Sequence, residues 1–101
     1  MKASKEDAVK IELSTRVKKS PNQVSCNLDG EVAILNLKSS LYFGLDAVGV
    51  AVWDKLSEPR QVSQICQVIT DQFDVSEQRC QADVIVLLSE LNKAGLIEIE
   101  A

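Results

Sequence analysis

The chain has 101 residues, 46% of them hydrophobic, which suits one small domain with a core. Its formal net charge of −4 opposes binding to phosphate backbones. No apolar run approaches the roughly 20 residues of a membrane helix, and the N-terminus lacks the pattern of a signal peptide. Cys26, Cys66 and Cys80 are an odd number and widely spaced, which favours reduced, buried thiols in a cytoplasmic protein.

We expect a partly flexible N-terminal arm over residues 1–22, followed by one domain over residues 23–99. The first eight residues are polar, and the alternation in residues 9–13 permits a short strand or an extended arm. We interpret the basic residues that follow as part of a solvated arm, with a docking patch as the alternative: Arg16, Lys18 and Lys19.

A β-hairpin over residues 23–37 is the clearest local signal. Asp29-Gly30 supplies the positive φ angles that a type I′ turn needs. A two-residue loop puts four apolar residues on one face, which we take as the core face: Val24, Cys26, Ala33 and Leu35. After a turn at residues 38–40, the strand Leu41–Phe43 completes a three-stranded antiparallel sheet and forms its edge.

Three helices are predicted after the sheet. Asp46 caps the first, and Gly49 inside it indicates close backbone packing or a shortened helix. Its buried stripe is Val48, Val52 and Leu56, with Trp53 beside it. The second helix follows Pro59 and carries Val62, Ile65, Val68, Ile69 and Phe73.

The third helix is capped by Ser76 and ends near Gly95. Its buried stripe is Cys80, Val84, Leu87, Leu88 and Leu91, and Val86 lies on a flank outside it. Residues 96–99 leave as an extended tail. The whole pattern predicts an α+β domain resembling a winged helix-turn-helix.

A winged-helix shape suggests a DNA-binding regulator, which we keep as the alternative function. The charges of the third helix oppose it, because a recognition helix needs basic and amide side chains. This helix instead carries Glu77, Asp83 and Glu90 against Arg79 and Lys93.

The residues also argue against an enzyme. The chain has no His, the commonest general base and metal ligand. No base partner is evident for any cysteine, and glycine-rich phosphate loops are absent. We therefore expect no catalytic residue, no cofactor and no metal.

The order of motifs resembles the PqqD-like family, the recognition elements that bind leader peptides in ribosomal peptide natural-product pathways. The matching pieces are Val17 to Pro21, Asp29-Gly30-Glu31, Leu35-Asn36-Leu37, Tyr42 to Asp46, Val48-Gly49, Val52-Trp53, Ile65, Phe73-Asp74-Val75, Asp83, Leu87-Leu88, Leu91 and Gly95-Leu96-Ile97. Ser39-Ser40 departs from the family, which often has a Gly in this turn. A free-standing chain of this size is most similar to the small recognition protein of lasso-peptide pathways, where a separate protease and cyclase do the chemistry.

The resemblance implies that a leader peptide adds as a strand to the sheet edge, beside pockets formed with the third helix. The expected peptide-binding residues are Leu41, Tyr42, Phe43, Gly44, Asp83, Val86, Leu87 and Glu90. Alternatively, residues 9–13 cover the edge and the helix flank is ordinary surface. The implied partners are the precursor peptide and a modifying enzyme, either a protease and cyclase or a radical enzyme, and the exposed edge also permits a homodimer.

Overall fold

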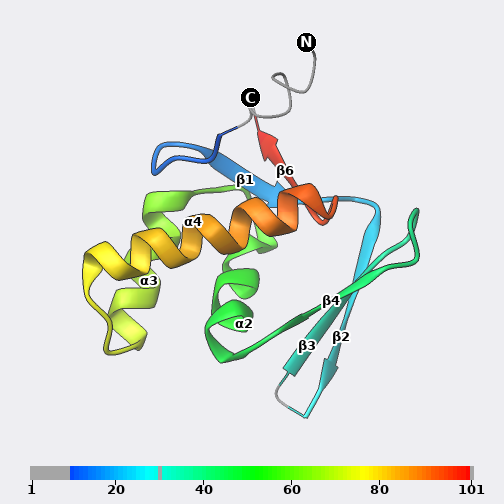
Figure 1. The fold of residues 1–101 in the computed structure, drawn as a ribbon, viewed down its shortest axis with the longest axis horizontal. Helices are drawn as coiled ribbons and strands as arrows, with labels where there is room; N and C mark the ends of the chain where they lie inside the picture. The colour runs from blue at the N-terminus through cyan, green and yellow to red at the C-terminus, as the bar shows by residue number, and fades with distance from the viewer. Residues whose placement is uncertain (1–9, 30, 101) are drawn as a thin grey trace.

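The computed structural model describes residues 10–29 and 31–100, and it confirms the α+β winged-helix-like class (Figure 1). The strands are β1 (Arg16–Lys19), β2 (Gln23–Leu28), β3 (Glu31–Asn36), β4 (Tyr42–Leu45), β5 (Arg60–Gln61) and β6 (Ile97–Glu100). The helices are α2 (Ala47–Asp54), the 3₁₀ turn η1 (Lys55–Ser57), α3 (Val62–Gln72) and α4 (Glu77–Lys93).

Strands β2, β3 and β4 form the predicted antiparallel sheet, with β4 at one edge and β2 at the other. The predicted register is confirmed, since Val24 lies opposite Leu35 and Cys26 opposite Ala33. Gly30 lies outside the described residues, so the type I′ assignment of the first turn stays a prediction. In the second turn Ser40 has φ +64°, a left-handed conformation that favours Gly.

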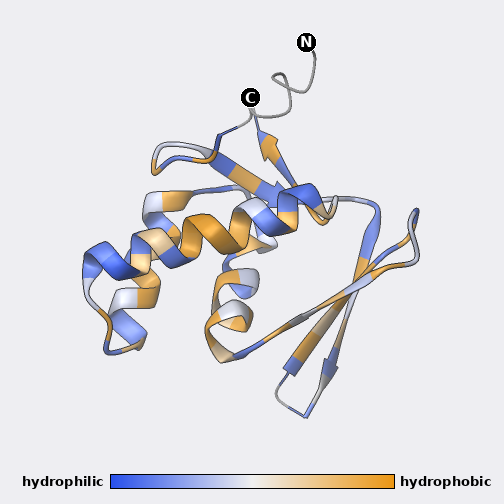
Figure 2. Cartoon of the chain, in the orientation of Figure 1, coloured by the Kyte–Doolittle hydropathy of each residue, from blue (hydrophilic) through white to orange (hydrophobic). Residues whose placement is uncertain are grey.

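The predicted core face of this sheet is wrong. Val24 is 51% exposed and Leu35 36% exposed, whereas Val32 and Ile34 on the other face are buried. Hydrophobic residues run along β3 on both faces, so alternation alone does not say which face is covered (Figure 2). Helix α2 packs beside β3 and β4 and selects the inner face. We call the opposite side, which carries Val24, Leu35, Leu37 and Tyr42, the outer face.

The helices bury most of the predicted stripes. Val52, Trp53 and Leu56 are at most 2% exposed, but Val48 is 37% exposed, so its place in the buried stripe is corrected. In α3 and α4 the buried side chains are Val62, Ile65, Cys66, Ile69, Cys80, Val84, Leu88 and Leu91. Leu87 is only half-buried, because it lies at the border of the α4 stripe.

The basic residues interpreted as a solvated arm belong to a second sheet, with strand order β5-β1-β6. Val17 at its centre is fully buried, and β1 pairs along its length with β6, the segment expected to leave as an extended tail. Two ion pairs link these strands: Arg16–Glu100 at 3.0 Å and Lys18–Glu98 at 4.0 Å. This pairing could not be predicted from local sequence patterns, because the two strands are distant in the chain. Residues 1–9 of the expected arm lie outside the described residues.

Candidate functional site: an open strand edge beside a groove

The backbone of β4 has hydrogen-bonding groups at the open edge of the sheet. The Asn36 N–H donates to the Leu41 carbonyl oxygen at 2.8 Å, and in the same register Phe43 lies opposite Ile34. Antiparallel pairing alternates, so Leu41, Phe43 and Leu45 bond to β3. The N–H and C=O of Tyr42 and Gly44 therefore point away from β3, toward the open edge.

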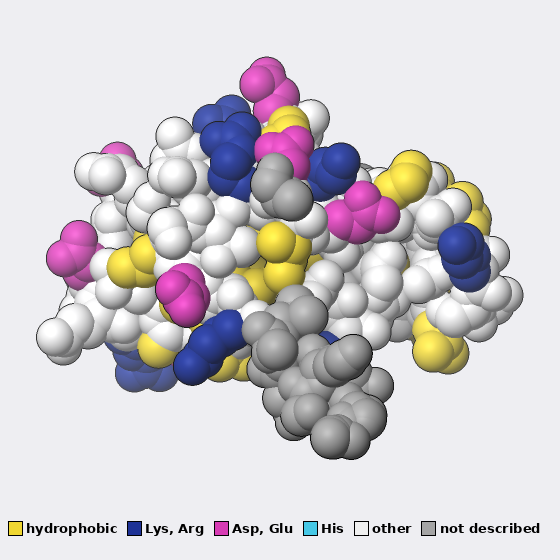
Figure 3. Space-filling view, turned by 90° about the horizontal axis from the view of Figure 1, so that it is seen from above, with side chains coloured by type: hydrophobic (Ala, Val, Ile, Leu, Met, Phe, Trp, Pro, Cys, Tyr) yellow, Lys and Arg dark blue, Asp and Glu magenta, His cyan; other side chains and the backbone are white. Residues whose placement is uncertain are grey.

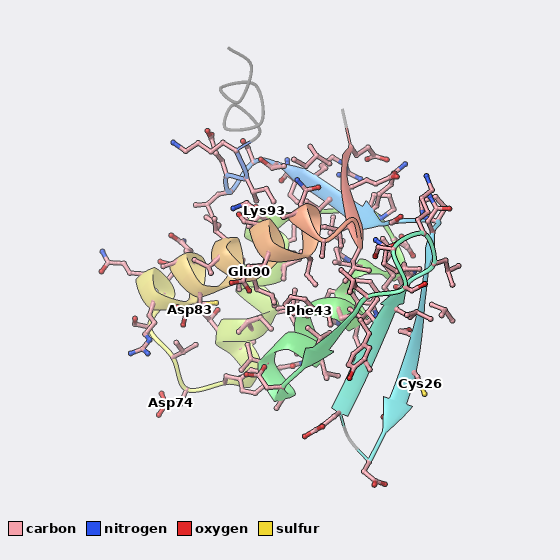
Figure 4. The ribbon with its side chains drawn as sticks, turned by 45° about the vertical axis from the view of Figure 1, so that its right-hand side comes forward. Cys26, Phe43, Asp74, Asp83, Glu90 and Lys93 are labelled. Atoms are coloured by element: carbon pink, nitrogen blue, oxygen red, sulfur yellow. The ribbon has the colours of Figure 1, made fainter. Side chains whose placement is uncertain are left out.

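A groove of about 320 Å³ lies between this edge and α4. It is lined by Phe43, Gly44, Leu45, Asp46, Gly49, Leu87 and Glu90. Figure 4 shows Phe43 on β4 toward the side of α4 that carries Glu90. Each wall contributes apolar side chains, Phe43 and Leu45 from β4 and Leu87 from α4, and the rest of the lining is polar, with carboxylates at Asp46 and Glu90. Such a groove can accept an extended peptide with an apolar anchor beside a basic residue.

The junction of β4 with α2 shapes one end of the groove. The Asp46 carboxylate accepts from the Gly49 N–H at 2.9 Å, which confirms the predicted N-cap. A Cβ on Gly49 would lie 3.0 Å from Cδ2 of Leu45, so there is close packing at this glycine, and α2 is also short, with eight residues. The first turn of α2 consequently lies directly against the end of β4.

Asn36 joins the two walls at the other end of the groove. Its Nδ2 donates to the Ala94 carbonyl oxygen at the end of α4 at 2.7 Å. Its Oδ1 accepts from the Lys38 and Ser39 N–H groups in the β3–β4 turn, at 2.8 and 3.1 Å. One side chain therefore orders the turn before β4 and ties it to α4.

The structure brings four of the eight predicted residues together in the groove lining, namely Phe43, Gly44, Leu87 and Glu90. Tyr42 reaches the edge through its backbone, while its side chain is 77% exposed on the outer face. Leu41 is 71% exposed and shares the groove side by alternation, but it is outside the lining.

The remaining predicted residues lie further along α4. Asp83 lines a neighbouring apolar pit of about 80 Å³ and pairs with Arg79 at 3.6 Å. Val86 is 57% exposed and lines neither cavity. Sequence reasoning missed Leu45, Asp46 and Gly49 as lining residues and Asn36 as the link between the walls. The motif pieces that carry the resemblance contained all four, without indicating a role in the site.

The alternative that residues 9–13 cover the edge finds no support in the part of this segment that the structure describes. The Leu13 carbonyl oxygen accepts from Ser63 N–H, and the Thr15 carbonyl oxygen accepts from Val62 N–H, both at 2.9 Å. This segment therefore packs at the start of α3. Val9 lies outside the described residues.

Two of the three thiols are buried between α3 and α4, as predicted, whereas Cys26 is exposed because the sheet face that carries it is the outer one. The Cys80 Sγ donates to the Cys66 carbonyl oxygen at 3.6 Å. Burial raises the pKa of the Cys66 thiol to about 11, with a further contribution from Cys80. Burial also raises the pKa of Cys80. Both groups are therefore protonated and poorly nucleophilic at neutral pH.

We expect a thiol reagent such as dithionitrobenzoate to modify one cysteine per native chain rapidly, because only Cys26 is exposed. All three should react after denaturation. Cys26→Ser should remove the rapid reaction and leave two thiols that react only on unfolding. Rapid reaction of two or three thiols in the native protein would contradict the buried positions of Cys66 and Cys80.

We also expect the free energy of unfolding to fall between pH 9 and about pH 11. The Cys66 thiol ionises near its ordinary pKa of 9.0 in the unfolded chain and near 11 in the folded one. Its contribution to stability is therefore complete below pH 9 and is lost as the pH rises through 11. Urea unfolding at successive pH values measures this. Cys66→Ala should show a smaller fall, and an equal fall would contradict the assignment.

Within residues 10–29 and 31–100, no group of three or more His, Cys, Asp or Glu side chains is placed to hold a metal ion. In the same part of the chain, no helix combines the length and the apolar character needed to cross a membrane.

Comparison with known proteins identifies the class to which this fold and groove belong. The family model of coenzyme PQQ synthesis protein D (PqqD) matches residues 31–97, more than half of the chain. The chain therefore belongs to the PqqD family, as the order of its motifs indicated.

Two solved structures are similar to this chain. TbiB1 in complex with the TbiA(beta) leader peptide is 34% identical, with a TM-score of 0.76 over 83% of this chain and 98% of that one. Lasso peptide synthetase B1 complexed with the leader peptide shares the fold at 16% identity, with a TM-score of 0.68 over 81% of this chain and 96% of that one. The search of curated proteins gave no match.

Proposed function

We propose that this protein binds the leader segment of a ribosomally synthesised precursor peptide and delivers it to a modifying enzyme. The observation that carries the proposal is the open β4 edge, whose Tyr42 and Gly44 backbone groups lie beside the groove to α4. An extended peptide can pair with these groups as an added strand. The relative TbiB1 was solved in complex with a leader peptide, which supports leader binding by this chain.

The groove lining sets the selectivity of the proposed site. Main-chain bonds to β4 accept any extended sequence, so specificity must come from side chains. Phe43 and Leu87 offer apolar contacts from the two walls, and the acidic groups of Asp46, Asp83 and Glu90 lie along their margin. A leader with an aliphatic or aromatic anchor and a nearby basic residue fits this combination.

The domain acts by delivery, since capture of a flexible precursor raises its effective concentration at a partner enzyme. We propose the leader protease and cyclase of lasso-peptide biosynthesis as partners, with no chemistry on this chain. The proposal places the protein in the cytoplasm, in keeping with its three free thiols. A dimer that pairs two β4 edges would use the same backbone groups, so edge pairing and leader binding exclude each other.

The surface charges give the DNA-binding alternative no support. Figure 3 shows basic and acidic side chains interspersed above β1 and β6, where ion pairs link the two strands. On α4, Asp83 and Glu90 lie along the exposed flank. A phosphate backbone would meet negative charge along this helix.

The proposed function is tested by titrating the protein with fluorescent leader peptides encoded by neighbouring reading frames. Random duplex DNA and a scrambled leader of equal composition serve as controls. We expect saturable leader binding that tolerates moderate salt, and no binding to the duplex. Salt-sensitive DNA binding without leader binding would contradict the proposal.

Leu87→Asp is expected to weaken leader binding by about tenfold or more, because it puts a charge in the apolar part of the groove. Val86→Asp should weaken binding less, because Val86 lies on the outer flank of α4. Fluorescence anisotropy measures both affinities, and circular dichroism verifies folding. Unchanged affinity in folded Val86→Asp would show that this residue does not contact the leader. Unchanged affinity in folded Leu87→Asp would show that the leader does not bind in the groove.

A further inference from the structure

The outer face of the β2–β3–β4 sheet has a surface that leader binding does not use. Its exposed side chains form a row across the three strands, in which Val24 lies opposite Leu35 and Leu35 opposite Tyr42. They are 51%, 36% and 77% exposed, and Leu37 beyond the end of β3 is 56% exposed. Among the described residues, the other large exposed hydrophobic side chains are Leu41, Val48 and Val86, on the groove side or the α4 flank.

We propose that this outer face is the interface of a homodimer, in which two copies stack their sheets face to face. Between the charged ends of the sheet, the described outer positions of β2 and β3 are all uncharged: Val24, Cys26, Ala33 and Leu35. Tyr42 and Gly44 continue this surface on β4. Two copies with a net charge of −4 each can thus meet here without opposing like charges at the centre of the contact.

The area of the patch agrees with a weak dimer. The exposed fractions correspond to roughly 400 Å² of apolar surface per copy, comparable to the largest patch of a typical monomer. Two such patches would bury roughly 800 Å² in total, below the ~1,200 Å² at which standard interfaces begin, so the contact is that of a weak, transient dimer. Tyr42, the most exposed of these residues, belongs to a residue type that is enriched at interface centres.

The charges at the two ends of the sheet specify how the copies are arranged. Glu31 begins β3 at the hairpin end, and Lys38 follows β3 at the opposite end. A two-fold axis in the interface, perpendicular to the strands, places the acidic end of one copy over the basic end of the other. A two-fold axis along the strands would superpose like charges, so the strands of the two sheets run in opposite directions.

Face-to-face stacking leaves the groove free. The Phe43 side chain is on the inner side of β4 with Leu45, whereas Cys26 is directed away from the helices (Figure 4). The dimer would therefore bind one extended peptide at each β4 edge. This distinguishes it from edge-paired dimers, which a peptide at β4 must displace.

The proposal is tested by sedimentation equilibrium of the full chain. The protein concentration runs from about 1 to several hundred micromolar, the range of dissociation constants expected for weak interfaces. We expect a monomer–dimer equilibrium. Leu35→Lys should raise its dissociation constant about tenfold or more, because it puts a charge at the centre of the contact. Gln67→Lys is the control, because it adds the same charge at an exposed position of α3. It should leave the dimer unchanged. Thermal unfolding verifies that both variants fold.

Charge exchange tests the arrangement. Lys38→Glu and Glu31→Lys should each weaken the dimer, and the double variant should restore it. Monomers at every concentration, or a dimer insensitive to Leu35→Lys, would overturn the proposal. Dissociation of the dimer by a saturating leader peptide would also overturn it in favour of edge pairing. Leader affinity is measured separately on the same samples. The result on dimerisation can therefore be interpreted even if the protein does not bind a leader.

Discussion

Gly44→Pro is expected to reduce leader affinity at least tenfold while the protein remains folded. The Gly44 N–H points to the open edge, so proline removes a donor for the incoming strand but no hydrogen bond to β3. A hydrogen bond contributes about 1 kcal/mol, and the proline ring adds a steric clash with the added strand. Isothermal titration calorimetry with the leader measures the change.

Two control variants separate loss of the edge from general damage. Gly44→Ala keeps the N–H, and a Cβ there would have no neighbour within 4 Å, so affinity should remain near that of the native protein. Ser25→Pro makes the same change at the opposite edge of the sheet. Leu37 N–H donates to Asn22 C=O, and residues of β2 alternate between bonding to β3 and facing outward. The Ser25 N–H therefore points away from β3, toward the open edge of β2. Equal losses for Gly44→Pro and Ser25→Pro would argue against an added strand at β4.

Asn36→Asp is expected to weaken leader binding several-fold. This is the size of effect that follows when one neutral or charge-assisted hydrogen bond is lost or altered. The aspartate keeps an oxygen that accepts from Lys38 and Ser39, so the turn should survive. It loses the donor to Ala94 and puts a negative charge at the C-terminus of α4, which is unfavourable. The distance between the groove walls should consequently become less well defined.

The comparison with Asn36→Ala and Asn27→Asp identifies the cause. Asn36→Ala removes both sets of hydrogen bonds and should lose at least as much affinity, together with thermal stability. Asn27 is exposed on the other edge strand, so Asn27→Asp adds the same charge away from the groove. If Asn36→Asp binds leader normally and only unfolds at a lower temperature, Asn36 has a structural role without positioning the site.

Local sequence signals predicted the elements of the fold well. Asp46 and Ser76 cap helices because their side chains can satisfy free amides within one turn, and both caps are confirmed. The hairpin register followed from a two-residue loop, and Gly95 ends α4 with φ +76°. Each of these features depends on neighbours a few residues away.

Features that depend on distant partners were not predictable from the chain alone. The pairing of β1 with β6 joins segments about eighty residues apart, and neither strand shows an unusual pattern. The covered face of β3 was mistaken because Val32 and Ile34 compete with Ala33 and Leu35 in hydrophobicity. Cys26 was consequently expected to be buried and is exposed.

The candidate site was predicted only in part, because some of its features also depend on residues that are distant in the chain. Phe43, Gly44, Leu87 and Glu90 follow from the family resemblance, and all four line the groove. Asn36 could not be assigned, because its role requires the end of α4 to lie beside the β3–β4 turn. Tyr42 stays a predicted site residue: its backbone lies at the open edge, whereas its side chain is on the outer face.

Amide hydrogen exchange by NMR, with and without bound leader, tests strand addition at β4 most directly. We expect the Tyr42 and Gly44 amides to become protected on binding, because they face the open edge. The Gln23, Ser25 and Asn27 amides at the β2 edge should exchange at unchanged rates. Saturating leader that leaves Tyr42 and Gly44 unprotected, or that protects the β2 edge instead, would contradict peptide capture at β4.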